Sequence, residues 1–597
     1  MEEQLSKEQG REPQSIPQRS AVPQRPGNPG KRTQPRQQRP NDGQNLRIIP
    51  LGGMGEIGKN MYVLEYGNDI LVIDAGFMFP EADMPGVDYV IPDVKYLEEN
   101  KHKVKGYLIT HAHEDHVGAL PYVLPKVPAP IYAPKLTAAL IQNKLKEFKI
   151  MGQLGIRTVD PDKDEKLQFG ALQVEFIRMV HSIPDAVAIV IHTPVGTVIA
   201  TGDFRFDFTP VDKKVPNIHR LVELSKEGVL ALLSDSTGAE SPGFSVTESA
   251  LQKNFDNIWT SASGRIVVAS FASQINRIQQ FINATAYSGR KLAFSGRSLL
   301  NNVEVAVRLG YLKIPSGMII KVQDINRYPD NQVTIVSTGS QGESMSALAR
   351  MASGDHKQIK IKRGDTVVFS SSPVPGNEDK IRKVIDDLFR QGAEVVYDEK
   401  DDIKTHVSGH PKQEELKLML SLVKPKYFIP YHGEYHHLIH HRDIAIEMNI
   451  PEKNIFVVDN GQVIEFDANG ARLNGKVPHG EVLVDGLGVG DVQNIVLRDR
   501  NIMSTDGIFV VIATVDKVSG RLLTSPDIIS RGFIYMRESE QLVNKARQEV
   551  RRILSKKEGE PPANWINMKN KVRDEIGQFL YNNTKRQPMV IPVIIEV

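Results

Sequence analysis

The chain has 597 residues, of which 40% are hydrophobic and 24% charged, as expected for a globular protein of two to four domains with large cores. It has no cysteine, which excludes disulfide frameworks and thiolate zinc sites, and its formal net charge of +2 leaves affinity for a polyanion to a local patch. No apolar run reaches the roughly 18–20 residues of a membrane-spanning helix and the N-terminus lacks a signal-peptide core, so we expect a cytoplasmic protein without membrane contact.

Residues 1–45 are rich in proline, glutamine and arginine and contain almost no apolar side chains. Such a segment cannot bury enough surface to offset its chain entropy, so we predict a disordered basic tail. The arginines could hold RNA or ribosomes loosely, or the tail could serve only as a solubilising extension.

Order is predicted to begin with a strand at 46–51, followed by a glycine-rich turn at 52–58 that matches G-x-G-x-x-G. The dinucleotide-binding fingerprint requires a helix next, but residues 60–66 and 70–73 are typical of a hairpin. We therefore reject a nucleotide cofactor and interpret the glycines as a turn that approaches an active site. Asp74 ends the hairpin and is expected to orient a ligand histidine, with a simple turn former as the alternative.

Three histidines and one aspartate lie within six residues, directly after a predicted strand at 106–110. They are His111, His113, Asp115 and His116. Imidazole and carboxylate ligands without cysteine suit zinc or manganese and leave positions open for water. A solvated polar loop is the less favoured interpretation.

Strands and helices then alternate, and polar side chains again follow the strands. Predicted strands are 131–134, 172–178, 186–191, 196–200 and 229–233, with a helix at 136–148. His181, Asp203 and Asp235 come directly after three of these strands.

A second α/β pattern occupies residues 247–368, after which the first pattern resumes. Its predicted strands are 265–269, 291–294, 318–322, 333–336 and 366–369, and no metal-type cluster appears among them. The resumed pattern has a helix at 380–391, a strand at 394–397, a polar loop at 404–410, a helix at 413–422 and a strand at 426–430 that leads to His432. We therefore expect one domain to interrupt another.

The C-terminal part is predicted to begin after a linker at 456–480. Strands are expected at 494–497, 508–514, 521–524 and 589–597, with helices at 539–556 and 568–583. Dimerisation, RNA contact and a purely stabilising role are all compatible with this β-α-β-type unit.

Seven potential metal ligands follow strands of the first pattern, and functional residues gather past the carboxyl ends of strands in open α/β sheets. We assign His111, His113 and His181 to one metal. We assign Asp115, His116 and His432 to a second metal, with the two-oxygen carboxylate of Asp203 bridging both.

We assign other roles to the histidines outside the seven candidate metal ligands. His410 could donate a proton to a leaving oxygen, with Asp235 holding its imidazole, although both could be structural loop residues. His436, His437, His440 and His441 have helical spacings that can bind metal, but they interleave with Leu438 and Ile439. A solvated or RNA-facing helix surface is the favoured interpretation for these four.

The sequence Thr-His-Ala-His-Glu-Asp-His at 110–116 resembles the H-x-H-x-D-H motif of the metallo-β-lactamase fold, and His181, Asp203 and His432 fall where its later ligands fall. The insert resembles the β-CASP domain of nucleic-acid-processing members, with Asp235, His410 and His432 at its motifs A, B and C. Residues 51–58, 271–273, 337–342, 369–378 and 530–535 resemble the bacterial ribonuclease J family, and the resemblance covers 46–597.

The resemblance implies an αββα metallo-β-lactamase sandwich interrupted by an α/β β-CASP domain and followed by an α+β C-terminal domain. The expected boundaries are 46–225 and 371–455 for the sandwich, 226–370 for the insert, 456–480 for the linker and 481–597 for the last domain.

It also implies a metal-dependent ribonuclease with 5′→3′ exonuclease activity, a preference for a 5′-monophosphate, and endonuclease activity, acting in RNA maturation and mRNA decay. Two Zn²⁺ ions are expected, with Mn²⁺ also able to support activity. A hydroxide would attack the phosphodiester and leave a 5′-phosphate, with Asp115, Asp203, His410 and Asp235 as catalytic residues.

Substrate contacts and partners follow from the same resemblance. Ser370, Ser371 and Ser372 look like the 5′-phosphate pocket, and Ser408, Gly409 and His410 like contacts to the terminal nucleotides. A homodimer or tetramer through the C-terminal domain is expected, with a paralogous subunit, a degradosome or the ribosome as further candidate partners.

Three rival functions stay open at this stage. The first is a DNA nuclease of the β-CASP group, against which the C-terminal domain and the signatures at 337–342 and 369–378 favour RNA. The second is a weakly active RNA-binding partner subunit, and the third is a small-molecule hydrolase, which would not need the insert. The chain departs from the family at Ala112, where glycine is usual, and at Pro411, which removes a backbone donor next to the His410 loop.

Overall fold

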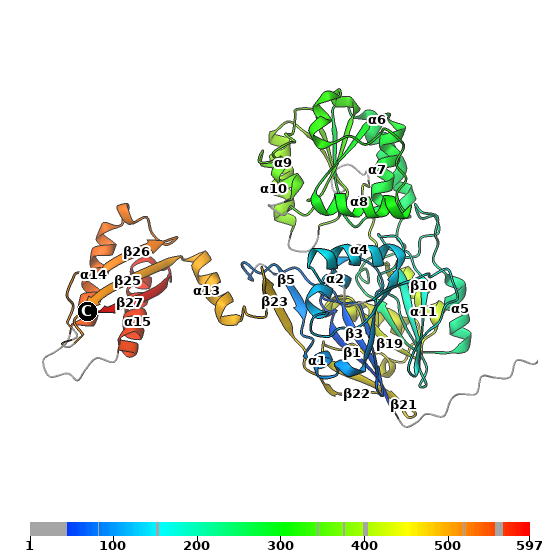
Figure 1. The fold of residues 1–597 in the computed structure, drawn as a ribbon, viewed down its shortest axis with the longest axis horizontal. Helices are drawn as coiled ribbons and strands as arrows, with labels where there is room; N and C mark the ends of the chain where they lie inside the picture. The colour runs from blue at the N-terminus through cyan, green and yellow to red at the C-terminus, as the bar shows by residue number, and fades with distance from the viewer. Residues whose placement is uncertain are drawn as a thin grey trace, which may run out of the picture. The chain divides into compact units, whose positions relative to one another are not determined.

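The computed structural model describes residues 44–597 except 82, 151–154, 343–345, 374–376, 398–403, 518, 520 and 556–564. The predicted tail at 1–45 therefore lies outside the described residues apart from its last two positions. Figure 1 traces the described elements from β1 to β27. None of the described helices is both long enough and apolar enough to span a membrane.

The first sheet has eight strands in the order β22-β21-β1-β3-β4-β6-β7-β8. Strands β4, β6, β7 and β8 run parallel, so their carboxyl ends meet at one edge. The bounds are β1 Leu46–Gly52, β3 Met61–Tyr66, β4 Asp69–Ile73, β6 Val104–Leu108, β7 Ile131–Pro134, β8 Ile156–Val159, β21 Gln462–Asp467 and β22 Gly470–Lys476.

The second sheet has six strands in the order β19-β13-β12-β11-β10-β9. Here β12, β13 and β19 are parallel neighbours. The bounds are β9 Leu167–Phe169, β10 Leu172–Arg178, β11 Val187–His192, β12 Thr197–Ala200, β13 Val229–Asp235 and β19 Tyr427–Tyr431.

The two sheets pack face to face and helices cover their outer faces, which confirms the predicted αββα sandwich. Leu64 and Leu71 of the first sheet share one core with Ile189 and Ile429 of the second. The first sheet is covered by α1 Lys95–Glu99, α3 Leu120–Val123 and α4 Lys135–Glu147. The second is covered by α5 Ile218–Glu227, α11 Gln413–Val423 and α12 Tyr435–Glu447. With both faces buried, strands such as β3 are apolar without alternation.

The inserted part is built on a parallel five-stranded sheet in the order β15-β16-β14-β17-β18. Helices α6, α7 and α8 cover one face and α9 and α10 the other (Figure 1). The bounds are β14 Ile266–Ala269, β15 Lys291–Ser295, β16 Val333–Ser337, β17 Thr366–Phe369, β18 Glu394–Val396, α6 Leu251–Ser261, α7 Ile275–Tyr287, α8 Arg297–Leu309, α9 Ala347–Ala352 and α10 Glu378–Arg390.

Three expectations about this region need correction. The helix and strand predicted at 380–391 and 394–397 belong to the inserted sheet, because β18 pairs with β17. The strand predicted at 318–322 is reduced to an isolated bridge between Leu292 and Ile319. The expected bounds of the insert, 226–370, also change. The inserted sheet continues past residue 370 to β18, and β13, which lies within those bounds, belongs to the sandwich.

Residues 456–480, expected to be a linker, include β21, which pairs with β1, and β22, which pairs with β21 and forms the edge of the first sheet. Val463, Ile464 and Phe466 of β21 are buried in the sandwich cores. Two small sheets complete this region. They contain β5 Tyr89–Pro92, β23 Glu481–Asp485 and β24 Gly488–Val489 in one, and β2 Met54–Gly55 with β20 Gly433–Glu434 in the other.

The last part is a three-stranded sheet, β26-β25-β27, with helices packed on one face. The bounds are α13 Asn494–Thr505, β25 Ile508–Val515, β26 Asp527–Arg531, α14 Glu540–Leu554, α15 Trp565–Thr584 and β27 Met589–Glu596. The strand predicted at 494–497 is wrong, because these residues begin α13. The strand predicted at 521–524 is reduced to one bridge at Leu522.

A buried ion pair connects the amino ends of β14 and β17 in the inserted sheet. Arg265 donates Nε and Nη2 to the two carboxylate oxygens of Asp365 at 2.9 and 2.5 Å, and each side chain is only 2% exposed. Removing one partner leaves a buried charge uncompensated, so Asp365→Ala is expected to lower the free energy of unfolding of this part by about 3–5 kcal/mol. Urea unfolding followed by the fluorescence of buried Trp259 measures this, in a Trp565→Phe background that leaves a single tryptophan.

Glu223→Gln is the control for that measurement. Its carboxylate meets Arg220 at 2.9 Å, but it is 60% exposed, and exposed pairs contribute little because water screens them. An Asp365→Ala midpoint no lower than that of Glu223→Gln would contradict a stabilising role for the buried pair.

Candidate metal centre

The seven predicted ligands converge at the carboxyl-end rim of the two central sheets. His111 and His113 lie in the loop after β6, Asp115 and His116 lie on the short helix α2 Glu114–Val117, and the others follow β10, β12 and β19. Helix α2 packs tightly on the segment after β4. A Cβ on Gly76 would lie 1.5 Å from the carbonyl oxygen of Asp115, so only glycine fits there.

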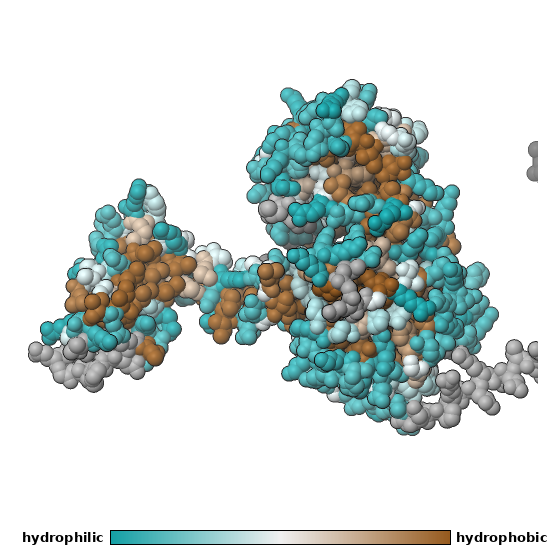
Figure 2. Space-filling view, in the orientation of Figure 1, coloured by the Kyte–Doolittle hydropathy of each residue, from teal (hydrophilic) through white to brown (hydrophobic). Residues whose placement is uncertain are grey.

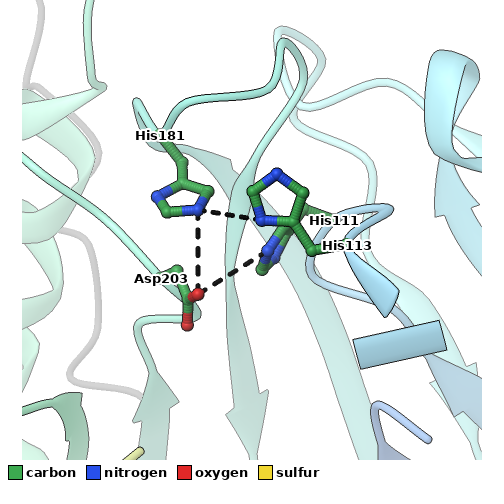
Figure 3. A group of neighbouring side chains, drawn as sticks. All are labelled: His111, His113, His181 and Asp203. Atoms are coloured by element: carbon green, nitrogen blue, oxygen red, sulfur yellow. Dashed lines mark hydrogen bonds and ion pairs between the residues drawn. The ribbon is translucent and has the colours of Figure 1, made fainter. Parts of the chain in front are cut away.

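Four of these side chains form a first group, whose members face one another in Figure 3. The Nε2 atoms of His111 and His181 each lie 3.7 Å from Oδ2 of Asp203. Nε2 of His181 lies 3.1 Å from Nδ1 of His113. Ligand atoms of one tetrahedral zinc ion, each about 2.0–2.2 Å from it, lie roughly 3.4 Å apart, so these separations are those of a shared ion.

A second group contains Asp115, His116 and His432 and shares Asp203 with the first. Nε2 of His116 lies 3.6 Å from Oδ2 of Asp115 and 3.3 Å from Oδ2 of Asp203. His432 places Nε2 3.3 Å from Asp115 and Nδ1 3.3 Å from Oδ1 of Asp203. The side chains therefore come together in the two sets that the sequence predicted, with one common carboxylate.

Two buried polar atoms in this centre have no hydrogen-bond partner among the described residues, namely His111 Nε2 and Asp203 Oδ1. Leaving a buried polar atom unsatisfied is unfavourable, and such atoms in a native site call for an explanation. Both belong to the donor set of a transition-metal ion, so the residues fit a bound divalent cation.

The first group is suited to bind a cation because its imidazoles are neutral. Burial lowers the pKa of His113 to about 4, and burial together with neighbouring histidines lowers the pKa of His111 and His181 well below the usual value. Neutral imidazoles keep a lone pair available, which is the form that a metal requires.

The second group is suited to positive charge for a different reason. Burial opposes protonation of His432, but the charge of Asp203, together with hydrogen bonds that His432 donates to Asp115 and Asp235, outweighs burial and raises its pKa to about 10. The pKa of His116 is raised in the same way, against burial, by Asp203, Asp115 and Asp74. These carboxylates stabilise a proton or a metal ion alike, so metal binding here should release protons.

Asp74 lies behind the second group and orients it. Its Oδ2 accepts from His116 Nδ1 at 2.7 Å, and it also accepts from the backbone and hydroxyl of Thr110 at 2.8 Å. This contact leaves Nε2 of His116 directed at Asp203. Both Asp74 and His432 adopt left-handed backbone conformations, with φ of 59° and 52°, as is common for residues held in place at functional sites.

Asp74→Ala is expected to lower the affinity of the centre for zinc by about 10–100-fold, because the imidazole of His116 loses the partner that orients it. Competition with a chromophoric chelator measures the affinity. Asp69→Ala, at a half-buried carboxylate at the other end of β4, is the control. Equal zinc affinity in Asp74→Ala and the control would show that the carboxylate does not support a ligand.

A second network surrounds His410. Its Nδ1 lies 2.8 Å from Oδ2 of Asp235 and 3.9 Å from Oδ2 of Asp203. Oδ1 of Asp235 also lies 3.4 Å from Nδ1 of His432, and Thr237 Oγ1 lies 3.0 Å from the same nitrogen. The predicted pairing of His410 with Asp235 is thus present in the geometry, next to the bridging carboxylate.

The predicted phosphate serines lie at the end of β17. Ser370 is buried, donates to the carbonyl of Thr405 at 2.6 Å and accepts from Arg277 Nη1 at 2.7 Å. Ser371 is partly exposed and Ser372 exposed, and Gln341 Nε2 contacts the hydroxyl of the first and the carbonyl of the second.

The Ser408-Gly409-His410 loop touches the metal centre directly. The Gly409 carbonyl accepts from His181 Nδ1 at 2.8 Å, which directs Nε2 of His181 toward the other ligands. A Cβ on Gly409 would lie 2.5 Å from the same ring, so glycine is required. The Ser408 carbonyl accepts from Arg205, and its hydroxyl accepts the His410 backbone N–H at 3.1 Å.

The glycine-rich turn approaches the centre, as predicted. The Gly53 carbonyl accepts the backbone N–H of His432 at 2.9 Å, and β2 pairs with β20 directly after that histidine. The turn therefore fixes the backbone that carries the last ligand.

The sequence did not predict the polar residues that hold the candidate ligands and the neighbouring loops in place. Thr110 and Thr237 hydrogen-bond ligand histidines, and Arg205, Glu248 and Arg277 form a buried chain of ion pairs between the His410 loop and the serine pocket. Thr110 and Thr237 lie next to predicted site residues, which was an available signal. The buried arginines had none, because arginine is usually a surface residue.

Four protein-family models match successive parts of the chain. They are the metallo-beta-lactamase superfamily at 54–237, the ribonuclease J beta-CASP domain at 263–388, the Zn-dependent metallo-hydrolase RNA specificity domain at 403–458 and the ribonuclease J C-terminal domain at 495–597.

Individual proteins match over nearly the whole chain. Ribonuclease J2 of Bacillus subtilis (strain 168) is 45% identical over 93% of this chain and 99% of its own length. Ribonuclease J 1 of Streptococcus pyogenes serotype M3 is 43% identical over 93% and 98%. Among solved structures, a protein of unknown function from Enterococcus faecalis V583 matches with a TM-score of 0.50 at 14% identity, over 70% of this chain and 100% of that one, which shows the fold alone.

Proposed function

This chain belongs to the ribonuclease J family of metallo-hydrolase ribonucleases, and on that premise we propose that it degrades RNA with two Zn²⁺ ions, as a 5′→3′ exonuclease and an endonuclease. One observation carries the proposal. Seven side chains from four segments come together in two groups that share the carboxylate of Asp203. RNA as the substrate is supported by the family models and by the relatives.

The ligands divide between the two ions as the groups divide. His111, His113 and His181 would hold one ion. Asp115, His116 and His432 would hold the other, and Asp203 would contact both. Two bound divalent cations supply a deprotonated water at neutral pH and neutralise charge on the scissile phosphate.

The chain's own residues then handle the leaving group. Asp235 accepts Nδ1–H of His410 and keeps the imidazole facing the centre. The protonated imidazole still has Nε2–H to give to the departing 3′-oxygen, which leaves the 5′-phosphate on the product. Asp203 lies 3.9 Å from the same imidazole and adds to the stabilisation of its positive charge.

A preference for a 5′-monophosphate is proposed from the serine pocket. Ser370 is engaged within the protein, so Ser371 and Ser372 are the hydroxyls that would meet a terminal phosphate. Arg277, whose charge is paired with Glu248, donates to Ser370 and so holds the start of this serine segment in place. Contacts from Ser408, Gly409 and His410 would hold the terminal nucleotides over the metals.

The test is cleavage of one RNA that carries either a 5′-monophosphate or a 5′-triphosphate, with Zn²⁺, Mn²⁺ or Mg²⁺, beside a DNA of the same sequence. The proposal expects nucleotides released stepwise from the 5′-monophosphate end, slower release from the triphosphate and no DNA cleavage. Cleavage of DNA at an equal rate would instead support a β-CASP DNA nuclease.

We further propose that the C-terminal sheet mediates self-association. Burial alternates strictly along β25, with Phe509 and Val511 buried against the helices, while the opposite face of the sheet exposes apolar side chains (Figure 2). The exposed residues on that face include Ile529, Ile591, Val593 and Ile595. A second copy of the same face is the occupant that fits, because the face is largely apolar and the two charged side chains that flank Ile529 on it, Asp527 and Arg531, are opposite in sign.

Val593→Lys/Ile595→Lys is expected to convert the dimer or tetramer to a monomer, because two buried charges in an apolar interface would be desolvated. Light scattering on a size-exclusion column measures the mass. Leu473→Lys is the control, because Leu473 is an exposed apolar residue on β22 of the two-sheet sandwich. A wild-type chain that already runs as a monomer, or an unchanged mass of the double variant, would contradict the proposed interface.

A further inference from the structure

Three imidazoles lie around the carboxylate of Glu240 outside the candidate metal centre, and a second carboxylate, that of Glu434, lies 3.5 Å from Nδ1 of His436. Glu240 lies in the loop after β13, and His436, His437 and His440 lie on the first turns of α12. Nε2 of His440 is 3.1 Å from one oxygen of Glu240, and Nε2 of His436 and His437 are 3.7 and 4.0 Å from the other. No residue of the catalytic centre belongs to this cluster.

The first and third of these imidazoles are one helical turn apart on α12. Residues four apart on a helix lie on the same face, and an i, i+4 pair of histidines is a common way to present two ligands to one ion. His440 lies 3.1 Å from one oxygen of Glu240 and His436 lies 3.7 Å from the other, so each imidazole has one carboxylate oxygen at about the 3.4 Å that separates two ligand atoms of one zinc ion.

The middle imidazole has another task. Nδ1 of His437 accepts the backbone N–H of Glu434 at 3.2 Å, as part of the cap that starts α12. A neutral imidazole that accepts at Nδ1 carries its proton on Nε2, so His437 has no lone pair to offer on the side that faces Glu240. The ligand set is therefore Glu240, His436 and His440.

We propose that these three residues form a peripheral site for a divalent d-block cation such as Zn²⁺. Each of the three side chains is about half exposed, at 48–49%, so water can complete the coordination and the ion can exchange with solvent. The site goes beyond the proposed ribonuclease activity, because none of its ligands takes part in that chemistry.

An ion at this site would connect segments that carry catalytic residues. The loop that contains Glu240 begins directly after Asp235, and α12 begins three residues after His432. Gln413, at the start of α11, also bonds this loop, donating Nε2 to the Ala239 carbonyl at 2.9 Å and its backbone N–H to Ser241. Binding would therefore stabilise the junction of β13, α11 and α12 against local unfolding.

The experiment counts the zinc bound to the full-length chain across a series of buffered free zinc concentrations. The wild type is expected to bind one more zinc per chain than His436→Ala/His440→Ala. Glu240→Gln should need about tenfold more free zinc to fill the same site. RNA cleavage by both variants should match the wild type, which also reports that they are folded.

Two controls separate this site from its surroundings. The additional zinc should remain bound to His437→Ala and to His102→Ala. His102 is an exposed histidine that is distant in sequence from the cluster. Asp203→Asn should lose catalytic zinc and keep the peripheral one, so failure of the proposed function and failure of this site give different counts. If the wild type and His436→Ala/His440→Ala bind the same number of zinc ions per chain, the proposed site does not exist. If His437→Ala loses the additional zinc, the assignment of the ligands is wrong.

Discussion

Asp203→Asn is expected to reduce RNA cleavage by about 10³-fold or more and to remove metal from both groups. Its carboxylate lies within 3.3–3.9 Å of four imidazoles and the ring of His410, so every part of the centre depends on its charge. An amide has the same shape but one oxygen and no charge. Losing about 4 kcal/mol of transition-state stabilisation corresponds to three factors of ten in rate.

Metal content by mass spectrometry and single-turnover cleavage are the two measurements for this variant. Glu114→Gln is the control, because Glu114 is the neighbour of Asp115 on α2 but pairs with Lys144 at the surface. It should keep both metals and full activity. An Asp203→Asn chain that retains two metals and cleaves RNA would show that Asp203 does not bridge the ions.

The candidate metal ligands could be predicted from the sequence because each follows a strand that is itself apolar and easily recognised. Four of them lie within 111–116, and His181, Asp203 and His432 lie just past the ends of β10, β12 and β19. The parallel neighbours β12, β13 and β19 end at one rim, which brings Asp203 and His432 to the same place despite the inserted sheet between them.

Sheet membership could not be predicted in the same way. A short apolar strand such as β18 has the same pattern in either sheet, and only its pairing with β17 assigns it. Residues 494–497 form too short an apolar run to separate a helix from a strand, and α13 has no buried residue to impose a helical period.

The peripheral cluster illustrates the same limit at a site. The spacing of His436 and His440 was visible in the sequence, but their carboxylate partner lies almost two hundred residues earlier. A histidine pair without a known third ligand is more often a solvated helix surface, so the pair alone did not predict a metal. Tertiary contact between the β13 loop and α12 supplies the missing ligand.

The pairing of His410 with Asp235 predicts a specific dependence of the rate on pH. Burial lowers the pKa of His410, but the carboxylates of Asp235 and Asp203 outweigh burial and raise it above the usual value. A general acid must be protonated, so the rate should fall as pH rises through this raised pKa. Asp235→Asn removes the main raising cause, so the alkaline limb of its pH–rate profile should move to lower pH.

His410→Ala is expected to lower RNA cleavage by about 10²-fold with both metals retained, because the leaving 3′-oxygen loses its proton donor. The decisive comparison uses bis(p-nitrophenyl) phosphate, whose nitrophenolate leaves without a proton. His410→Ala should cleave this ester at nearly the wild-type rate, since proton donation is then not needed, whereas Asp203→Asn should fail on both substrates. An equal loss on RNA and on the activated ester would mean that His410 positions the phosphate and does not deliver the proton.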